Sequence, residues 1–419
     1  MKLLIKSATI LDTSSKYNGK KRDVLISNGV IEKIAAKIEL PKGYKKISFP
    51  NLHISKGWFD SSTSFGEPGY EDRETLQNGL QTAALSGFTS VAVNANTFPV
   101  IDSKSDIEFL KSKAQQHAVN LYPIGALTMN AEGETLAELF DMQNSGAVCF
   151  YDYQKPIKNA NLLKIALQYT QPFNGLVQSF PMDQTVAENG VMNEEVTSTS
   201  LGLKGIPALS EELQIIRDLY ILEYTEGSLH IPTISTKKAV SLIKEAKKKG
   251  LDVSCSVSIN NLVLTDDALT DFNTNLKVLP PLRTQNDVNA LIKGIQNGVI
   301  DGVTSEHNPI DIENKKTEFD HALFGSIGLE SCFGALNTIV GKEKAVDMLC
   351  SLKNRFGVKQ YTIETGNEAE ITFFNPDEEY IFTEDLILST SKNAALLGKV
   401  IKGKAYGIYS NKKLIITND

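Results

Sequence analysis

The stretch that decides the fold of this chain is Gly57-Trp58-Phe59-Asp60-Ser61-Ser62-Thr63-Ser64-Phe65-Gly66-Glu67-Pro68-Gly69. It begins with apolar residues typical of a buried strand and continues with a cluster of small polar residues. The Glu-Pro-Gly at its end then predicts a tight turn. Because alternate residues of a strand share a face, we expect Ser62 and Ser64 to point the same way at the end of this strand.

Strand-like runs alternate with helix-like stretches on the C-terminal side of this segment. The clearest pairs are residues 74–84 with 88–93, 160–169 with 176–177, 211–224 with 229–231, 237–249 with 253–257, and 285–296 with 302–304. Repeated units of this kind favour a parallel sheet covered by helices, and a (β/α)8 barrel over residues 53–369 fits the length. An open doubly wound sheet is the alternative, although no Gly-x-Gly-x-x-Gly follows a strand.

The two ends of the chain are rich in short β-like runs instead. Residues 1–52 contain three such runs with turn signals such as Asn28-Gly29 between them, and residues 370–419 repeat the pattern. We therefore predict one small β domain built from both termini. Two unrelated terminal hairpins are the alternative, but isolated hairpins are only marginally stable.

Composition places the chain among ordinary globular proteins. It has 419 residues, 41% hydrophobic and 22% charged, with a net charge of -7. The acidic balance argues against a nucleic-acid partner, and no apolar run reaches membrane-spanning length. The start is too short and too quickly polar for a signal peptide, so we expect a cytoplasmic protein. Cys149, Cys255, Cys332 and Cys350 are widely spaced among apolar neighbours and are predicted to be reduced core thiols.

The opening stretch resembles the first barrel strand of class I dihydroorotases and their cyclic-amidohydrolase relatives. In that family two histidines and an arginine precede the same Glu-Pro-Gly. Further motifs in the same order extend the resemblance over nearly the whole chain: Gly87–Val91, Asn96–Asp102, Gly190–Glu194, Leu201–Ala208, Leu229–Ile231, Pro280–Thr284 and Phe324–Glu330. The resemblance implies an amidohydrolase barrel whose one or two zinc ions activate water to open or close a six-membered cyclic amide in pyrimidine synthesis.

The same resemblance implies that this chain lacks the metal ligands. The family's histidine positions carry Ser62, Ser64, Gln178 and Thr233, a further His-His pair is Asn260-Asn261, the catalytic aspartate position is Glu306, and the bridging ligand falls near Asp152. Hydroxyl and amide groups are poor zinc ligands, and without zinc a water keeps a pKa of ~15.7 rather than ~7. We therefore expect no catalytic residue, no zinc and no other cofactor.

Other polar residues near these positions have simpler interpretations. Asp60 is expected to hold the strand-end turn. His230 lies on the other strand face and is predicted to be a buried, hydrogen-bonded histidine. Glu306 and His307 are adjacent, so they are expected to face opposite ways and not to form an acid–base pair.

The resemblance also implies a degraded substrate site. The family arginine that clamps the substrate carboxylate is Gly66, an asparagine is Leu279, and a histidine is Ile310. Losing the arginine removes a bidentate cationic group. Only Asn96 and the backbone of Gly325 remain as candidates for substrate binding.

These observations predict a noncatalytic dihydroorotase-like protein, kept as a structural or regulatory partner. A homo-oligomer is expected, and the family precedent suggests aspartate carbamoyltransferase as a partner. One alternative is an active dihydroorotase or related cyclic amidase with an atypical metal site. The other is a binding module that uses the old pocket for a neutral polar ligand. That pocket would be lined by Ser62, Ser64, Asn96, Gln178, Thr233, Asn260 and Glu306.

Overall fold

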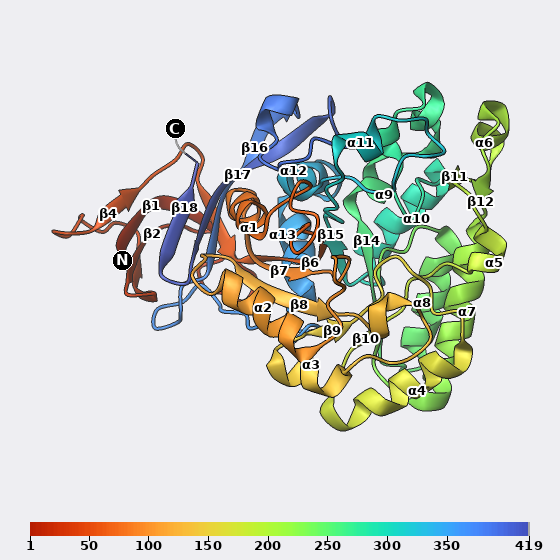
Figure 1. Ribbon diagram of the computed structural model, residues 1–419. Helices are drawn as coiled ribbons and strands as arrows, with labels where there is room; N and C mark the ends of the chain where they lie inside the picture. The colour runs from red at the N-terminus through yellow and green to blue at the C-terminus, as the bar shows by residue number, and fades with distance from the viewer. Residues whose placement is uncertain (418–419) are drawn as a thin grey trace.

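A closed parallel barrel forms the centre of the computed structural model, which describes residues 1–417 (Figure 1). Its strands follow one another in chain order around the sheet. They are β6 Trp58–Thr63, β7 Phe88–Val93, β8 Asn120–Gly125, β9 Cys149–Phe150, β10 Val177–Gln178, β13 Leu229–Ile231, β14 Val253–Ser258 and β15 Gly302–Thr304. The last strand returns to the first, because Ser64 N donates to His307 O at 2.7 Å. The predicted (β/α)8 fold is therefore confirmed.

Helices cover the outside of the barrel (Figure 1). The longer ones are α1 Leu76–Leu85, α2 Lys104–Ala114, α3 Leu139–Ser145, α4 Ala160–Thr170, α7 Ala208–Thr225, α8 Lys237–Lys248, α10 Gln285–Gln296, α12 Leu329–Val340 and α13 Lys342–Cys350. Short helices α5 Gln184–Ala187, α6 Val196–Leu201, α9 Ile259–Val263 and α11 Ile312–Lys315 lie in the connections, with the small pair β11 Met192–Asn193 and β12 Gly205–Ile206. Among residues 1–417, no helix combines the length and the hydropathy needed to cross a bilayer.

A second sheet is built from both ends of the chain, which lie on the same side of the molecule in Figure 1. Its strands are β1 Lys2–Leu11, β2 Lys21–Ser27, β3 Val30–Ala35, β4 Lys45–Ile47, β5 His53–Lys56, β16 Ile371–Ile381, β17 Val400–Ser410 and β18 Lys413–Ile416. The strand β5 joins the two halves, because it pairs with β1 on one side and β16 on the other. The sequence analysis placed β5 with the barrel, and the division into two domains stays a prediction.

Aromatic packing connects the two sheets at the start of the barrel. Trp58 opens β6 and is fully buried, with its ring 4.5 Å from Phe333 of α12 and 5.4 Å from Phe374 of β16. Beside it, the carboxylate of Glu370 accepts hydrogen bonds from Lys353 and Thr89. Because Lys353 is 1% exposed and Glu370 9% exposed, this ion pair is well shielded from water.

Two expectations about local structure have clear outcomes. The four cysteines are buried and unpaired, as the sequence predicted. Asn260 and Asn261, matched to a ligand pair of a strand, lie instead in helix α9 directly after β14. The helix begins there because the Ser258 hydroxyl caps it by accepting a hydrogen bond from Asn260 N at 3.2 Å.

Replacing Glu370 with alanine tests the buried ion pair. The change leaves the Lys353 ammonium buried without a counter-charge, so we expect the free energy of unfolding to fall by about 3–5 kcal/mol. Urea denaturation of the full chain measures it. The matched control is Glu223→Ala, which breaks an exposed pair with Lys249 and should cost less than about 1 kcal/mol. Equal losses in the two variants would contradict the assignment.

Candidate functional site

The carboxyl ends of the first two barrel strands carry a small polar cluster. Ser62 and Ser64 are both buried, and the side chain of Asn94, which directly follows β7, lies between them. Asn94 Nδ2 donates to Ser62 Oγ at 3.1 Å and to Ser64 Oγ at 3.2 Å. The two serines do converge, as the sequence predicted, but they converge on an amide NH2 group. A hydrogen-bond donor therefore faces the atoms that would have to bind a cation in place of the family's histidines.

Glu306 is buried beside this cluster, two residues after the end of β15. Burial raises the pKa of its carboxyl group to about 7, and the nearby hydroxyls of Tyr153 and Ser62 only partly offset that effect. Tyr153 and Ser62 are the hydroxyl donors within reach of this buried carboxyl group. Glu306 Oε1 accepts a long hydrogen bond of 3.4 Å from Gln154 Nε2.

Asp60 holds the strand-end turn, as predicted, and also fixes the position of Glu306. Its carboxylate accepts hydrogen bonds from Ser62 N at 3.0 Å and from Ser305 N at 3.0 Å. The hydroxyl of Thr304 also donates to it, at 2.5 Å. Every one of these donors comes from β6 or from the end of β15, so Asp60 has a structural role at the barrel closure.

Other residues at the expected ligand positions take part in separate contacts. Gln178 Nε2 donates to Cys149 Sγ at 2.8 Å, across β9 and β10. Thr233 N donates weakly to Ser256 Oγ at 3.4 Å. The carboxylate of Asp152 accepts from Leu127 N at 2.8 Å and Thr128 N at 3.0 Å, so it is committed to a loop. The structure thus brings Ser62, Ser64 and Glu306 together. Gln178, Thr233 and Asp152 lie outside that cluster.

Several residues other than glycine have left-handed backbones at this end of the barrel, and three of them lie at or beside the expected site. Gln154, Thr233 and Glu306 have φ values of 54°, 47° and 49°, and each follows a barrel strand by a few residues. The conformation is least favourable for Thr233, because its side chain is β-branched. Such strain costs on the order of 1–3 kcal/mol per residue and typically gathers at functional sites.

The expected substrate clamp is closed by the backbone itself. A Cβ atom at Gly66 would lie 1.8 Å from Tyr70 O, so no side chain fits there. Gly325 is also committed, because its N–H donates to Lys277 O at 3.0 Å and its carbonyl accepts from Asn393 at 3.1 Å. Asn96 is half-buried.

The remaining clamp positions lie in two different places. Leu279 O accepts a hydrogen bond from Gln154 Nε2 at 2.9 Å, which holds the Gln154 side chain over Glu306. Ile310 lines a separate cavity of about 570 Å³ with Asp311, Lys316 and Ser391. A smaller cavity of about 200 Å³ lies beside Asp152, Gln154 and Lys155.

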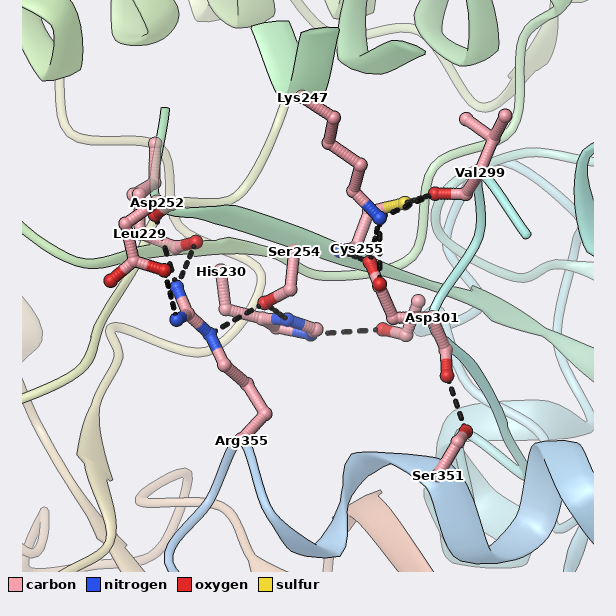
Figure 2. Close-up of polar contacts among 11 residues, drawn as sticks. Leu229, His230, Lys247, Asp252, Ser254, Cys255, Val299, Asp301, Ser351 and Arg355 are labelled. Atoms are coloured by element: carbon pink, nitrogen blue, oxygen red, sulfur yellow. Dashed lines mark hydrogen bonds and ion pairs between the residues drawn. The ribbon is translucent and has the colours of Figure 1, made fainter. Parts of the chain in front are cut away.

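His230 belongs to a polar chain inside the barrel (Figure 2). Arg355 Nε, which can only donate, donates to Ser254 Oγ at 2.8 Å, and Ser254 Oγ lies 2.8 Å from His230 Nδ1. On the other side of the ring, His230 Nε2 lies 3.2 Å from Ser256 Oγ, so both ring nitrogens have a hydroxyl partner. Burial also lowers the pKa of His230 well below its usual value. The prediction of a buried, hydrogen-bonded histidine is confirmed.

Proteins of known name match this chain in sequence over nearly its full length. The family model described as Dihydro-orotase-like matches residues 54–239. A dihydroorotase of Acetivibrio thermocellus is 36% identical over 99% of both chains, and one of Pelotomaculum thermopropionicum is 38% identical over 96% of both. The chain belongs to the dihydroorotase-like family.

Solved structures support the fold of this dihydroorotase-like chain. The L-hydantoinase (dihydropyrimidinase) from Arthrobacter aurescens superposes with a TM-score of 0.86, covering 99% of this chain and 96% of that one, at 19% identity. The dihydropyrimidinase from Brevibacillus agri NCHU1002 gives a TM-score of 0.84 at 19% identity, covering 100% and 95% of the two chains. At this identity the likeness speaks for the barrel fold alone.

The donor atoms of this dihydroorotase-like chain do not fit zinc. A hydrolytic zinc site needs about three imidazole, thiolate or carboxylate ligands with one open position. Among residues 1–417, no group of three histidine, cysteine, aspartate or glutamate side chains lies close enough to hold a metal ion. The buried imidazole nearest Glu306 in sequence, His307, is turned away, because its Nδ1 accepts from Gly328 N at 3.2 Å. Glu306 and His307 therefore form no acid–base pair, as expected.

The sequence analysis assigned no role to Asn94, Tyr153 or Gln154, which the structure places beside Ser62, Ser64 or Glu306. The resemblance pointed instead to Asn96, two residues after Asn94. The signal for Asn94 was its place directly after the apolar strand Phe88–Val93, where a polar side chain faces the barrel mouth.

Relieving the strain at Thr233 should stabilise the protein. In Thr233→Gly the left-handed backbone costs little, and a buried hydroxyl without a partner among residues 1–417 disappears. We expect the free energy of unfolding to rise by about 1 kcal/mol, measured by urea denaturation. Thr236→Gly is the matched control and should lower it, because Thr236 has a negative φ and caps α8 through Ala239 N at 3.1 Å. A loss in both variants would show that Thr233 is not strained.

Proposed function

We propose that this chain is a noncatalytic member of the dihydroorotase-like family, kept in the cytoplasm as a structural or regulatory partner in pyrimidine biosynthesis. The observation that carries the proposal is the hydrogen bonding of Asn94 Nδ2 to both Ser62 and Ser64. Serine oxygens that accept from an amide, at positions where the family has histidines, do not supply the nitrogen ligands that zinc requires.

The chemistry of hydrolysis is unsupported at the other positions as well. Without a Lewis acid, water is not ionised near neutral pH, and activating it by zinc lowers its pKa by many units. Glu306 is too buried to meet a bulk water, and Asp60 is committed to three donors of the barrel closure. The carboxylate clamp is lost at Gly66, where the backbone leaves no room for a side chain.

A surface suited to assembly supports the second half of the proposal. Helix α7 exposes large apolar side chains along one stripe at spacings of three and four residues, which places them on one helix face. They are Leu209, Leu213, Ile216, Tyr220 and Tyr224. Tyr220 and Tyr224 are 77% and 73% exposed. An exposed apolar stripe of this length is typical of protein–protein contacts.

The stripe fits either a second copy of this chain or a different protein. The precedent of the family suggests aspartate carbamoyltransferase, whose product an active dihydroorotase consumes. We therefore propose a homo-oligomer that contacts this enzyme as its partner.

The absence of turnover is the first test of this proposal. We expect the purified full chain, supplied with zinc, neither to cyclise carbamoyl aspartate nor to open dihydroorotate above background. The double variant Ser62→His/Ser64→His should stay inactive, because two imidazoles do not complete a zinc site. Spectrophotometric assays with elemental analysis of the same samples measure both. Wild-type turnover that disappears in Glu306→Gln while Glu108→Gln retains it would overturn the proposal.

The mass of the assembly in solution tests whether the exposed stripe of helix α7 is a protein–protein contact. We expect Tyr220→Ser/Tyr224→Ser to shift the wild-type complex to a smaller species in analytical ultracentrifugation, alone or with aspartate carbamoyltransferase. Removing exposed aromatic groups should leave the fold intact, because surface changes rarely cost more than about 0.5 kcal/mol. Ile381→Ser, a change at a 55% exposed apolar position in the terminal sheet, is the control. A wild-type chain that is monomeric both alone and with that enzyme contradicts the partner role.

A further inference from the structure

Helices α3, α4 and α7 present one apolar face to the outside of the barrel. They follow one another along the lower side of the molecule in Figure 1, and α4 packs against α7. The ring of Phe173 links α3 to α4, because it lies 5.4 Å from Phe140 and 5.7 Å from Tyr169. The face consists of the exposed α7 stripe together with Phe140, Ile165 and Tyr169. The next helices, α8 and α10, are described over their full length and expose no large apolar side chain.

The size of this face matches that of a stable protein–protein contact. Its eight side chains are between 39% and 77% exposed, so at roughly 200 Å² for a whole large side chain they present about 800 Å² together. A standard interface buries about 800 Å² on each partner. A cavity of about 530 Å³ between α3 and α4, lined by Phe140, Ile165 and Tyr169, adds a hollow that can receive a side chain.

Opposite charges border this face on its two sides. Glu132, Glu134, Glu138 and Asp141 are exposed on the α3 side, whereas Lys237, Lys238, Lys244 and Lys248 are exposed on α8. Among residues 1–417 none of these eight groups forms an ion pair, although Lys249 of α8 is paired with Glu223. Two lysines open α8 although a positive charge opposes the helix dipole there, so a counter-charge from outside the chain would stabilise them.

We infer that this face joins two copies of the chain about a two-fold axis that runs along the helices, between α4 and α7. Such an axis sets α7 of one copy on α4 of the other, and α8 on α3. Tyr220 and Tyr224, the most exposed members of the stripe, then cover the cavity between α3 and α4. The lysines of α8 meet the carboxylates of α3, and each contact occurs twice because the interface is isologous. One chain carries both halves of the contact, so a second copy satisfies the whole face.

The charges select this arrangement over the other symmetric one. In an antiparallel contact of α7 with its copy, the two-fold axis crosses the helices, so α8 would face α8 and α3 would face α3. Like charges would then meet at both borders, which opposes association. With the axis along the helices, the first turns of α3 and α8 lie at the same height, because both helices start at the mouth of the barrel. Lys238 of one copy is therefore expected opposite Asp141 of the other.

The inference rests on the proposed assembly role and names a second copy as the partner of this face, and its test measures association rather than turnover. Sedimentation equilibrium follows charge reversal in the full chain. We expect Asp141→Lys and Lys238→Glu each to weaken the dimer at least about tenfold, because each reversal brings like charges together twice. The double variant Asp141→Lys/Lys238→Glu should return the dissociation constant to within about threefold of wild type, since it restores the pair with its charges exchanged. Such a return also shows that both changes leave the fold intact.

Lys45→Glu, at an exposed position of β4 in the terminal sheet, is the matched control and should leave the dimer unchanged. A second measurement needs no variant: carbodiimide coupling of mixed ¹⁴N- and ¹⁵N-labelled wild-type chains, followed by mass spectrometry. It should join Lys237 or Lys238 of one chain to Glu138 or Asp141 of the other. A monomeric wild-type chain, a dimer indifferent to both reversals, or links between chains confined to other surfaces would overturn the inference. A monomer that still binds aspartate carbamoyltransferase would overturn it while leaving the proposed partner role standing.

Discussion

The carboxylate of Asp60 is the interaction on which the rest of the site depends. It joins the first barrel strand to the last by accepting hydrogen bonds from Ser62, Thr304 and Ser305. Parallel strands leave unpaired backbone groups wherever a sheet stops, so a barrel needs its two edge strands to meet. Asp60 supplies acceptors at that meeting point, and its side chain is fully buried there.

The same carboxylate sets the positions of the polar side chains at the barrel mouth. Ser62 follows it by two residues, and Glu306 follows the Thr304-Ser305 pair that it holds. A fixed frame with changed side chains thus explains how the chain can match dihydroorotases over nearly its full length while residues 1–417 hold no group of three side chains that could bind zinc. Packing and closure require apolar residues and a few buried hydrogen bonds, whereas zinc requires particular donor atoms. A chain can therefore lose the zinc ligands and still keep the residues that pack and close the barrel.

The fold could be predicted from the sequence because the sequence signals for it are local or repeated. The Glu-Pro-Gly turn, the alternation of strands and helices, and the β-rich ends each needed only neighbouring residues. The position of β5 was less readable, because its partners β1 and β16 are far apart in the chain. At the site, the substitutions at Ser62, Ser64 and Gly66 were visible, but the role of Asn94 depends on how β6 and β7 align. The left-handed backbones of Gln154, Thr233 and Glu306 leave no trace in residue type, since none is glycine or asparagine.

The closed turn at Gly66 has a consequence for the history of the protein. The loop from Gly66 to Glu74 folds back so tightly that Tyr70 O occupies the space a side chain would need. A single nucleotide change that introduced arginine there would first destabilise the fold. Several coordinated changes in this loop would have to come first, so an evolving chain could gain a cationic side chain at this position only by a path of several steps.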